Sequence, residues 1–322
     1  MAKSRIADIT DEQWQLVNVF NRKKAEEFLE QAHLSDATLK QYASALKIFL
    51  VWVYEEQEDK KIIELKPRHA LSYQNYLIRK GLSSNAVKFK RSVVSSFCGY
   101  MEVYYGEEYE TFRNIYSKSI PNPQKQNINE KIPLTLEEYN LLLETLITQE
   151  EWQMVAYLQF SYYSSGRRAE VLQITKDIMN IPAEQGNDGT FYTINNIRGK
   201  GRGKEGKPIK LRFTQEARDA IEKWLEVRGD DDCPYIFVHK RKNGKTSQLK
   251  VETFNNWCST KFTEIVGRRT YPHLFRSTRA THLKVNYGKS IESIKNLLNH
   301  NSSETTQIYI VDPKQDSVDD LF

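Results

Sequence analysis

The C-terminal part of the chain gathers residue types that handle phosphate. His273 and Arg276 are three positions apart, so a helix through them places both side chains on one face. Asn299 stands where a helix should end, and Asn tolerates the left-handed conformation of that position, so we expect His300 at a fixed turn. Tyr309 follows nine residues later. One such feature alone is usually a surface pair or a packing residue, but the combination is much less common by chance.

A further basic position precedes this region. Arg167 and Glu170 are again three positions apart, within the segment YYSSGRRAEVLQI. One interpretation is an ion pair inside a helix, worth a few tenths of a kcal/mol. The other places Arg167 at the start of a helix, where backbone N–H groups already favour an anion.

A glycine-rich basic segment, IRGKGRGKEGKPIKL, covers residues 197–211. Gly201 to Lys207 is one residue short of the G-x-x-x-x-G-K-[ST] loop that cradles nucleotide phosphates. Pro208 occupies the place of the Mg²⁺-binding Ser or Thr, and a strand pattern follows where that loop requires a helix. A nucleotide-hydrolysing enzyme is therefore disfavoured. The segment is either a solvated basic hairpin or a loop that brings a lysine to another phosphate.

The elements that position these residues begin with a helical N-terminal part. Thr10 and Gln13 form a capping box that opens a helix reaching to about residue 31. Ser35 precedes another helix, whose apolar residues recur in steps of three and four. Further helices are expected over 67–80 and 84–104.

A linker and a mixed α/β part follow. Residues 119–133 hold three prolines and no apolar period, as a linker does. Thr135 then caps helical sequence that continues to about residue 174. The stretches FYTINNIR and PIKLRF flank the glycine-rich segment and predict a β-hairpin. The remaining helices are expected over 214–228, 252–266, 274–287 and 290–298.

The composition describes a globular protein with two domains. Its 322 residues exceed the roughly 250–300 at which single cores stop growing. The net charge of +5 is compatible with a nucleic-acid partner but does not identify one. The three cysteines lack the spacing of a disulfide framework or a zinc finger. Neither a leader-like apolar region nor an apolar run of membrane length occurs, so we expect a cytoplasmic protein with no membrane partner.

Five segments resemble, in order and spacing, the catalytic motifs of the tyrosine recombinases, also called phage-type integrases. The segments are SSGRRAE (164–170), GKG (199–201), HLFRSTRATHL (273–283), LNH (298–300) and TTQIY (305–309). The match covers roughly residues 135–312. Three departures occur, and none removes a reacting group: Ser277 replaces a frequent His, Asn299 replaces Gly, and Ser165-Gly166 replaces Gly-Leu.

The resemblance implies a set of catalytic residues. They are Arg167, Lys200, His273, Arg276, His300 and Tyr309, with Glu170 as a supporting residue. Tyr309 would be the nucleophile and Lys200 the general acid, while the two arginines grip the scissile phosphate and the two histidines complete its pocket. The glycines would let Lys200 swing toward the phosphate, and Lys204 and Lys207 are close enough to compete with it. Two guanidinium groups supply what a metal clamp supplies elsewhere, so we expect no metal ion and no cofactor.

The resemblance also implies the architecture and the partners. The expected domains are a helical core-binding domain over 1–120, a linker over 121–133, a catalytic domain over 134–312 and a C-terminal tail over 313–322. The partner would be double-stranded DNA with specific recombination sites, bound by a homotetramer in the nucleoid, with the tail docked on a neighbouring copy and without a nucleotide cofactor. The residues expected to hold DNA phosphates are Lys88, Lys90, Arg91, Arg202 and Lys204.

The favoured function is therefore site-specific DNA recombination, of the integrase or excisionase type, by a phage or another mobile element. Strand exchange would pass through a covalent 3′-phosphotyrosine. Two alternatives share the scaffold: a type IB topoisomerase, which nicks and reseals DNA alone, and a DNA-binding protein without catalysis.

Overall fold

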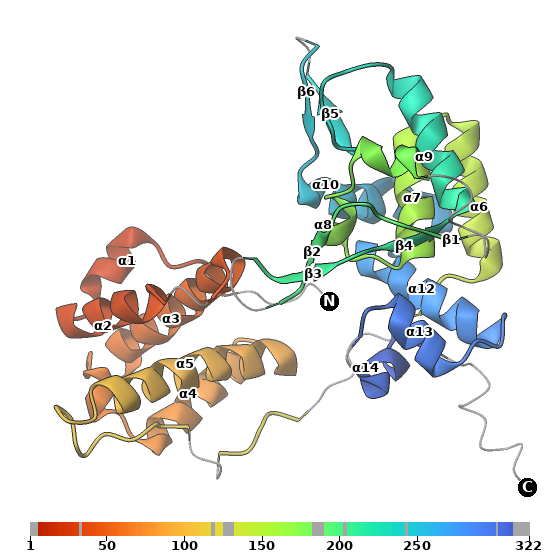
Figure 1. Cartoon of the computed structure of the whole chain (residues 1–322). Helices are drawn as coiled ribbons and strands as arrows, with labels where there is room; N and C mark the ends of the chain where they lie inside the picture. The colour runs from red at the N-terminus through yellow and green to blue at the C-terminus, as the bar shows by residue number, and fades with distance from the viewer. Residues whose placement is uncertain are drawn as a thin grey trace, which may run out of the picture. The chain divides into compact units, whose positions relative to one another are not determined.

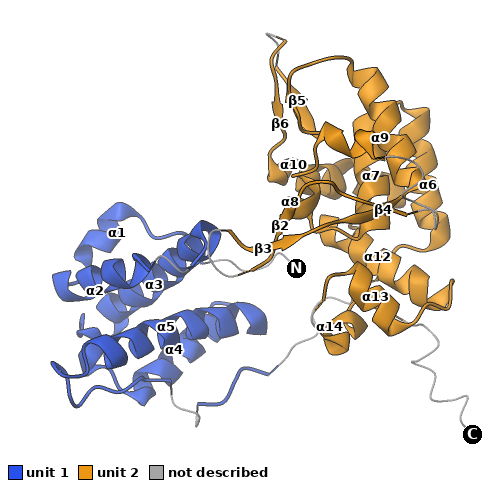
Figure 2. Ribbon diagram, in the orientation of Figure 1, with its two compact units in different colours: residues 1–129, 202–204 blue, residues 130–201, 205–322 orange. Residues whose placement is uncertain are grey.

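The computed structural model describes residues 6–31, 34–116, 120–124, 132–181, 190–201, 205–241, 244–300 and 302–311. These residues form two compact units, which Figure 2 shows in different colours. Within the described residues, the N-terminal unit is built of helices, whereas the C-terminal unit combines helices with short antiparallel strands (Figure 1). The expected fold class, mainly α with a small antiparallel sheet component, is confirmed.

The N-terminal unit packs its helices around an aromatic core. The rings of Phe49 and Trp52 lie 4.9 and 5.1 Å from the ring of Tyr73, measured between centroids, and all three side chains are buried. Such ring pairs add to the stability gained by burying their area. The helices are α1 (Asp11–Leu16), α2 (Val19–Leu29), α3 (Asp36–Glu56), the 3₁₀ turn η1 (Ile62–Glu64), α4 (Pro67–Arg79) and α5 (Ser84–Tyr104).

The prediction of one helix from Thr10 to about residue 31 is wrong in extent. The capping box at Thr10 forms as expected, but α1 ends at Leu16 and α2 begins at Val19. Asn18 separates the two helices because its side chain caps α2, accepting from the N–H of Asn21 at 2.8 Å, and its Nδ2 donates to Asp59 at 2.9 Å. A contact with a distant part of the chain thus overrides the local helical pattern. The predictions for α3, α4 and α5 are confirmed.

The C-terminal unit is organised around α7 (Trp152–Ser164), which packs against α6 (Leu136–Thr148), α9 (Gln215–Arg228) and α12 (Pro272–Val285). Apolar residues on several faces of α7, among them Tyr157 and Phe160, are buried in the core of this unit. Burial on several faces is typical of a helix at the centre of a domain. The other helices are α8 (Arg168–Val171), η2 (Lys176–Asn180), α10 (Val251–Trp257), the π-helical turn Cys258–Phe262, α11 (Thr263–Val266), α13 (Ile291–Leu297) and α14 (Ser303–Gln307).

Two pairs of strands form the predicted β-hairpin. Strand β1 (Thr190–Tyr192) pairs with β4 (Arg212–Thr214), and β2 (Ile197–Gly199) pairs with β3 (Lys207–Ile209), both antiparallel. The register sets Phe191 opposite Phe213 and Ile197 opposite Ile209, and these apolar residues are buried. Strand β3 follows the glycine-rich loop, whereas a nucleotide-binding loop requires a helix at this place.

A second hairpin, β5 (Val238–Lys240) with β6 (Thr246–Gln248), is absent from the sequence prediction. Its signal was present in the sequence, since an Asn-Gly dipeptide, here at 243–244, is a strong sequence signal for a hairpin. No helix in the described part of the chain is both long and apolar enough to cross a membrane.

Candidate active site

Helix α12 carries two of the predicted residues on one turn. Pro272 occupies its first turn, where a missing N–H costs nothing, and His273 and Arg276 follow three positions apart as predicted. Arg276 is 2% exposed. A buried guanidinium needs partners for its donors, because transferring a charge out of water is otherwise costly.

Arg276 finds those partners on two separate segments. Its Nη1 donates to the carbonyl oxygen of Ser165, and its Nη2 donates to the carbonyl oxygen of Leu298 and contacts His300 Nε2 at 2.8 Å. Its Nε has no acceptor among the described residues. Burial, helped by the nearby charge of Arg167, lowers the pKa of Arg276 to about 10. The side chain is therefore still charged at neutral pH, and one buried donor is left for a further acceptor.

Arg167 and Glu170 are locked together at the start of α8. The predicted helical run to residue 174 is wrong here, because Ser165 adopts the left-handed conformation with φ 51° and ends α7. Arg167 then caps α8, and its backbone N–H and its Nη1 donate to the Glu170 carboxylate at 2.7 and 2.8 Å. Glu170 is 2% exposed. A buried carboxylate thus fixes the guanidinium of Arg167.

His300 is held in one tautomer. Asn299 has φ 51°, so the predicted left-handed turn is confirmed. Arg276 can only donate, so His300 Nε2 must accept; Nδ1 then carries the proton and donates to Thr306 Oγ1 at 3.1 Å. Burial and then the charges of Arg276 and Arg167 lower the pKa of His300 to about 4, which keeps the ring neutral at physiological pH.

Tyr309 lies within this group of side chains. Its hydroxyl is 2.7 Å from His273 Nε2. The centroid of its ring lies 4.9 Å from the His300 ring and 5.4 Å from the Arg276 guanidinium carbon. Thr281 of α12 fixes the backbone around it, since its Oγ1 accepts from the N–H of Val311 at 3.1 Å. We call Arg167, Glu170, His273, Arg276, His300 and Tyr309 the Tyr309 cluster.

Lys200 lies apart from these contacts. It follows β2 and is exposed, and no hydrogen bond or ion pair joins it to the Tyr309 cluster in the described part of the chain. The glycines around it allow close approach of two backbones, and their use in letting Lys200 swing stays a prediction. A Cβ at Gly201 would lie 2.5 Å from the backbone nitrogen of Lys207, and one at Gly206, where φ is +67°, would lie 2.5 Å from the carbonyl oxygen of Gly199.

The residues expected to hold DNA differ in their surroundings. Lys88 and Lys90 are half-exposed on α5, while Arg202 and Lys204 lie outside the described residues. Arg91 is 8% exposed and donates to the carbonyl oxygens of Ile120 and Pro121 at 3.2 and 2.8 Å, and to Gln74. We therefore remove Arg91 from the expected DNA contacts, because its guanidinium is enclosed and fixes the segment after the N-terminal helices.

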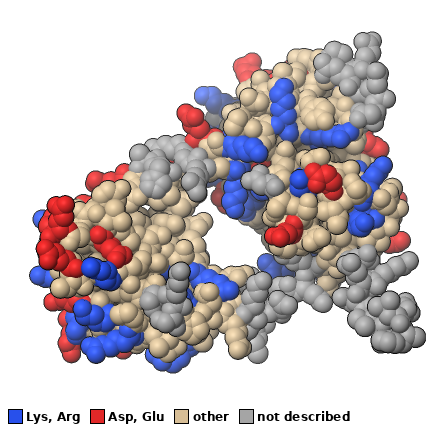
Figure 3. Space-filling model, turned by 60° about the horizontal axis from the view of Figure 1, so that its bottom comes forward, with Lys and Arg blue, Asp and Glu red and all other residues tan. Residues whose placement is uncertain are grey.

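On the face of the molecule drawn in Figure 3, the described basic side chains do not gather into one continuous area. In the view of Figure 3, Lys and Arg side chains cover several separate areas of both units, with Asp and Glu among them. This mixture agrees with the small net charge of +5.

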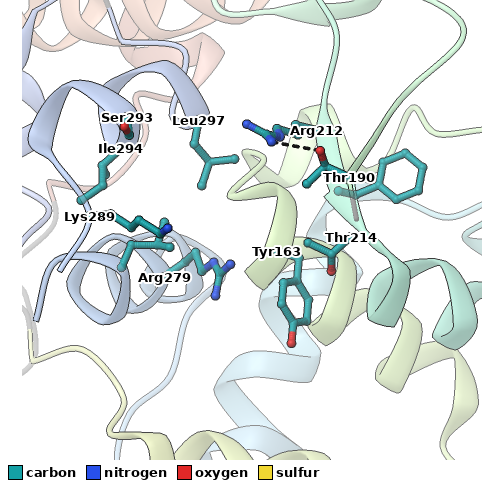
Figure 4. A pocket seen from close by; sticks show the side chains of 11 residues that line it. Tyr163, Thr190, Arg212, Thr214, Arg279, Lys289, Ser293, Ile294 and Leu297 are labelled. Atoms are coloured by element: carbon teal, nitrogen blue, oxygen red, sulfur yellow. Dashed lines mark hydrogen bonds between the residues drawn. The ribbon is translucent and has the colours of Figure 1, made fainter. Parts of the chain in front are cut away.

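The Tyr309 cluster is separate from the pocket shown in Figure 4. That pocket has a volume of 330 Å³ and is lined by α7, α12, α13 and the β1–β4 pair, with Arg212, Arg279 and Lys289 as its cations. Its lining includes no member of the cluster. Among the described residues, no group of three or more His, Cys, Asp or Glu side chains is arranged to hold a metal ion.

Sequence reasoning missed two residues that shape the cluster. Thr306 is fully buried and accepts the hydrogen bond of His300 Nδ1, and Thr281 fixes the backbone at Tyr309. Both fall inside motifs that were recognised, but a Thr in a motif gives no sign of its partner. Only the folded chain brings Thr306 to the imidazole.

Comparison with known proteins decides the family. The family model described as "Phage integrase family" matches residues 133–315, and the model described as "Phage integrase, N-terminal SAM-like domain" matches residues 22–104. The chain belongs to the phage integrase family of tyrosine recombinases. The predicted membership of the tyrosine recombinases is thereby confirmed.

Relatives extend over most of the chain. The SPbeta prophage-derived recombinase-like protein YomM of Bacillus subtilis (strain 168) is 31% identical over 307 residues, covering 94% of this chain and 90% of that protein. Tyrosine recombinase XerA of Thermococcus onnurineus (strain NA1) is 28% identical, in a match that covers 76% of this chain and 77% of that protein.

Solved structures share the fold. A lambda integrase (75-356) dimer bound to a COC′ core site has a TM-score of 0.66 at 15% identity, covering 96% of this chain and 98% of that one. A lambda integrase tetramer bound to a Holliday junction has a TM-score of 0.65 at 15% identity, covering 95% of this chain and 78% of that one. At this identity the likeness concerns the fold.

Proposed function

We propose that this protein is an active site-specific recombinase that cuts and rejoins DNA through a covalent 3′-phosphotyrosine at Tyr309. One observation carries the proposal: the Tyr309 hydroxyl lies 2.7 Å from His273 Nε2, beside the Arg276–His300 pair of the same chain. Tyr309, His273 and Arg276 would supply a nucleophile, a proton acceptor and a buried cation from one chain. A silent DNA-binding protein would not need this arrangement.

The cations of the cluster would bind the scissile phosphate. Arg276 has a buried Nε donor without an acceptor among the described residues, and a non-bridging phosphate oxygen would satisfy it. Arg167 is fixed by Glu170 at 2.8 Å and would supply a second guanidinium. Donors fixed before the reaction stabilise the developing charge without reorganising, which is the largest effect in many enzymes.

The protons have defined routes. The Tyr309 oxygen attacks phosphorus, and its proton passes to His273 Nε2, 2.7 Å away. The bond from phosphorus to the 5′ oxygen breaks, and Lys200 gives that oxygen a proton. A phosphotyrosine forms and conserves the bond energy, so a 5′-hydroxyl of another strand can reverse the step and no nucleotide cofactor is needed.

The partners follow from the family. The lambda integrase structures hold a core site and a Holliday junction. By likeness to them, we propose that this chain acts on double-stranded DNA as a homotetramer, within the nucleoid. Its helical domain, residues 1–120, would contact phosphates through Lys88 and Lys90, and the tail over 313–322 would dock on a neighbouring copy. The likeness to a prophage-derived protein supports an origin in a phage or other mobile element.

A covalent complex on nicked DNA tests the proposal. The DNA site is first selected by binding from a random pool, and a nick near the cleavage position then lets the short 5′-hydroxyl strand diffuse away. We expect an adduct that resists denaturation and releases a strand with a free 5′-hydroxyl. Bound DNA without any adduct would favour the silent scaffold and overturn the proposal.

Assembly separates recombination from topoisomerase activity. We expect recombinant products from two sites, together with a complex of four protein chains. Relaxation of supercoiled DNA by a monomer, without recombinant products, would favour a type IB topoisomerase.

The role of Lys200 has its own test. Lys200→Ala should slow cleavage of ordinary DNA, since general acids contribute about 10²–10⁴-fold. A 5′-bridging phosphorothioate, whose thiolate leaves without a proton, should restore the rate. Lys207→Ala is the control for a nearby lysine, and rescue of that variant instead would reassign the acid.

A further inference from the structure

Gln173 joins the short helix of the Tyr309 cluster to the strand that leads to Lys200. Its backbone N–H donates to the carbonyl oxygen of Glu170 at 3.1 Å, so it sits one turn after that carboxylate. Its side-chain Nε2 donates to the carbonyl oxygen of Ala169 in α8 at 2.6 Å. The same side chain therefore has one contact on the helix that Arg167 caps.

The other contacts of this amide lie on β2. Arg198 donates its backbone N–H to Gln173 Oε1 at 2.9 Å and accepts from Gln173 Nε2 at 3.1 Å. Opposite Arg198 in the β2–β3 ladder stands Pro208, which has no N–H to offer. The N–H and C=O of Arg198 turn away from β3, and the amide of Gln173 engages both as a neighbouring strand would.

The hydrogen bonds between Gln173 and Arg198 limit how far Lys200 can lie from Gln173. Arg198 precedes Lys200 by two residues, a span of about 7 Å in an extended chain. Beyond β2 the described residues show no hydrogen bond or ion pair on the Lys200 side chain. The Gln173 amide is thus a fixed point between the lysine and the α8 helix.

We propose that Gln173 is a positioning residue, which holds the strand of Lys200 against α8 so that the lysine and Arg167 address the same phosphate. This proposal rests on the function proposed above. In this role Gln173 would touch neither DNA nor the reacting atoms. Its loss should leave the cluster able to attack but should misplace the proton donor.

Gln173→Met tests this assignment, since it keeps the length of the side chain and removes the amide. We expect about ten-fold slower cleavage of ordinary DNA, as a poorly placed general acid loses part of its effect. The rate on the 5′-bridging phosphorothioate should stay close to that of the unmodified chain. In a Lys200→Ala background, Gln173→Met should cause no further loss, because the group it positions is gone.

Gln215→Met is the matched control. Gln215 lies on α9, and its Nε2 donates to Asp219 at 2.5 Å on the surface. This variant should cleave both substrates at the unmodified rate. If Gln173→Met unfolds, Gln173→Glu keeps the acceptor for the Arg198 N–H, loses both donated bonds and undergoes the same comparison.

Equal slowing on both substrates would overturn the proposal, since a merely structural role acts on every substrate. An unchanged rate on ordinary DNA would overturn it as well. Failure of the proposed function is distinguishable, because the unmodified chain would then form no adduct with either substrate.

Discussion

Replacing Thr306 with valine tests how the cluster holds His300. Thr306 is fully buried, and valine matches its shape, so packing is retained while the hydroxyl is lost. His300 Nδ1 then has no acceptor in place of the one at 3.1 Å. The alternative tautomer would turn an Nε2–H toward the Arg276 donor 2.8 Å away, so the ring cannot escape by moving its proton.

The magnitude follows from the unsatisfied donor. A buried N–H left without a partner costs about 1–3 kcal/mol. If the ring relaxes away in the resting variant and must return to its place when the phosphate reacts, this cost appears in the barrier as about 5- to 150-fold slower cleavage, at about 1.4 kcal/mol for each factor of ten. Single-turnover cleavage of nicked DNA measures it directly.

Two variants control the experiment. Thr306→Ser keeps the hydroxyl and should cleave at close to the unmodified rate. Thr305→Val removes a hydroxyl one position away that bonds Ser302 at the exposed start of α14, and it should also be near normal. Unmodified cleavage by Thr306→Val, or equal slowing by Thr306→Ser, would refute the reasoning.

The remaining predictions use the same site. The pKa of His300 is lowered to about 4, so between the ordinary value near 6.5 and 4 the unfolded chain binds a proton that the folded chain does not. His300 therefore makes the fold less stable as the pH falls from about 6.5 to about 4. Over this range the melting temperature of His300→Gln should rise relative to that of the unmodified chain. A difference in melting temperature that does not change with pH would contradict this prediction. Gly206→Ala should slow cleavage far more than Gly244→Ala, because both have positive φ but only the Cβ at Gly206 meets a backbone atom, at 2.5 Å. Equal cleavage rates in the two glycine variants would contradict the functional importance of the close approach between Gly206 and the backbone of Gly199.

Local signals predicted the parts of the site that depend on neighbouring residues. The three-residue spacing of His273 and Arg276 became one turn of α12, and Asn299 adopted the left-handed turn. Glycines and alternating polarity predicted the β1–β4 and β2–β3 pairs. Each of these signals is a conformational preference of a few adjacent residues, so the local structure can be predicted without knowing contacts between distant residues.

Contacts between distant residues account for most of what the sequence did not reveal. Asn18 breaks the first helix because Asp59, far along the chain, bonds its side chain. Arg91 is enclosed by carbonyl oxygens of Ile120 and Pro121, so a basic residue in a basic run is not a surface residue. The partnership of Thr306 with His300 likewise exists only after the turn at Asn299 has formed.

Mass spectrometry of the adduct tests the central claim most directly. The unmodified chain is trapped on nicked DNA, digested and searched for the peptide that carries a nucleotide phosphate. We predict that the phosphate is on Tyr309, whose hydroxyl lies 2.7 Å from His273, and that Tyr309→Phe forms no adduct while still binding the DNA. An adduct that persists in Tyr309→Phe, or that maps to another residue, would contradict the account.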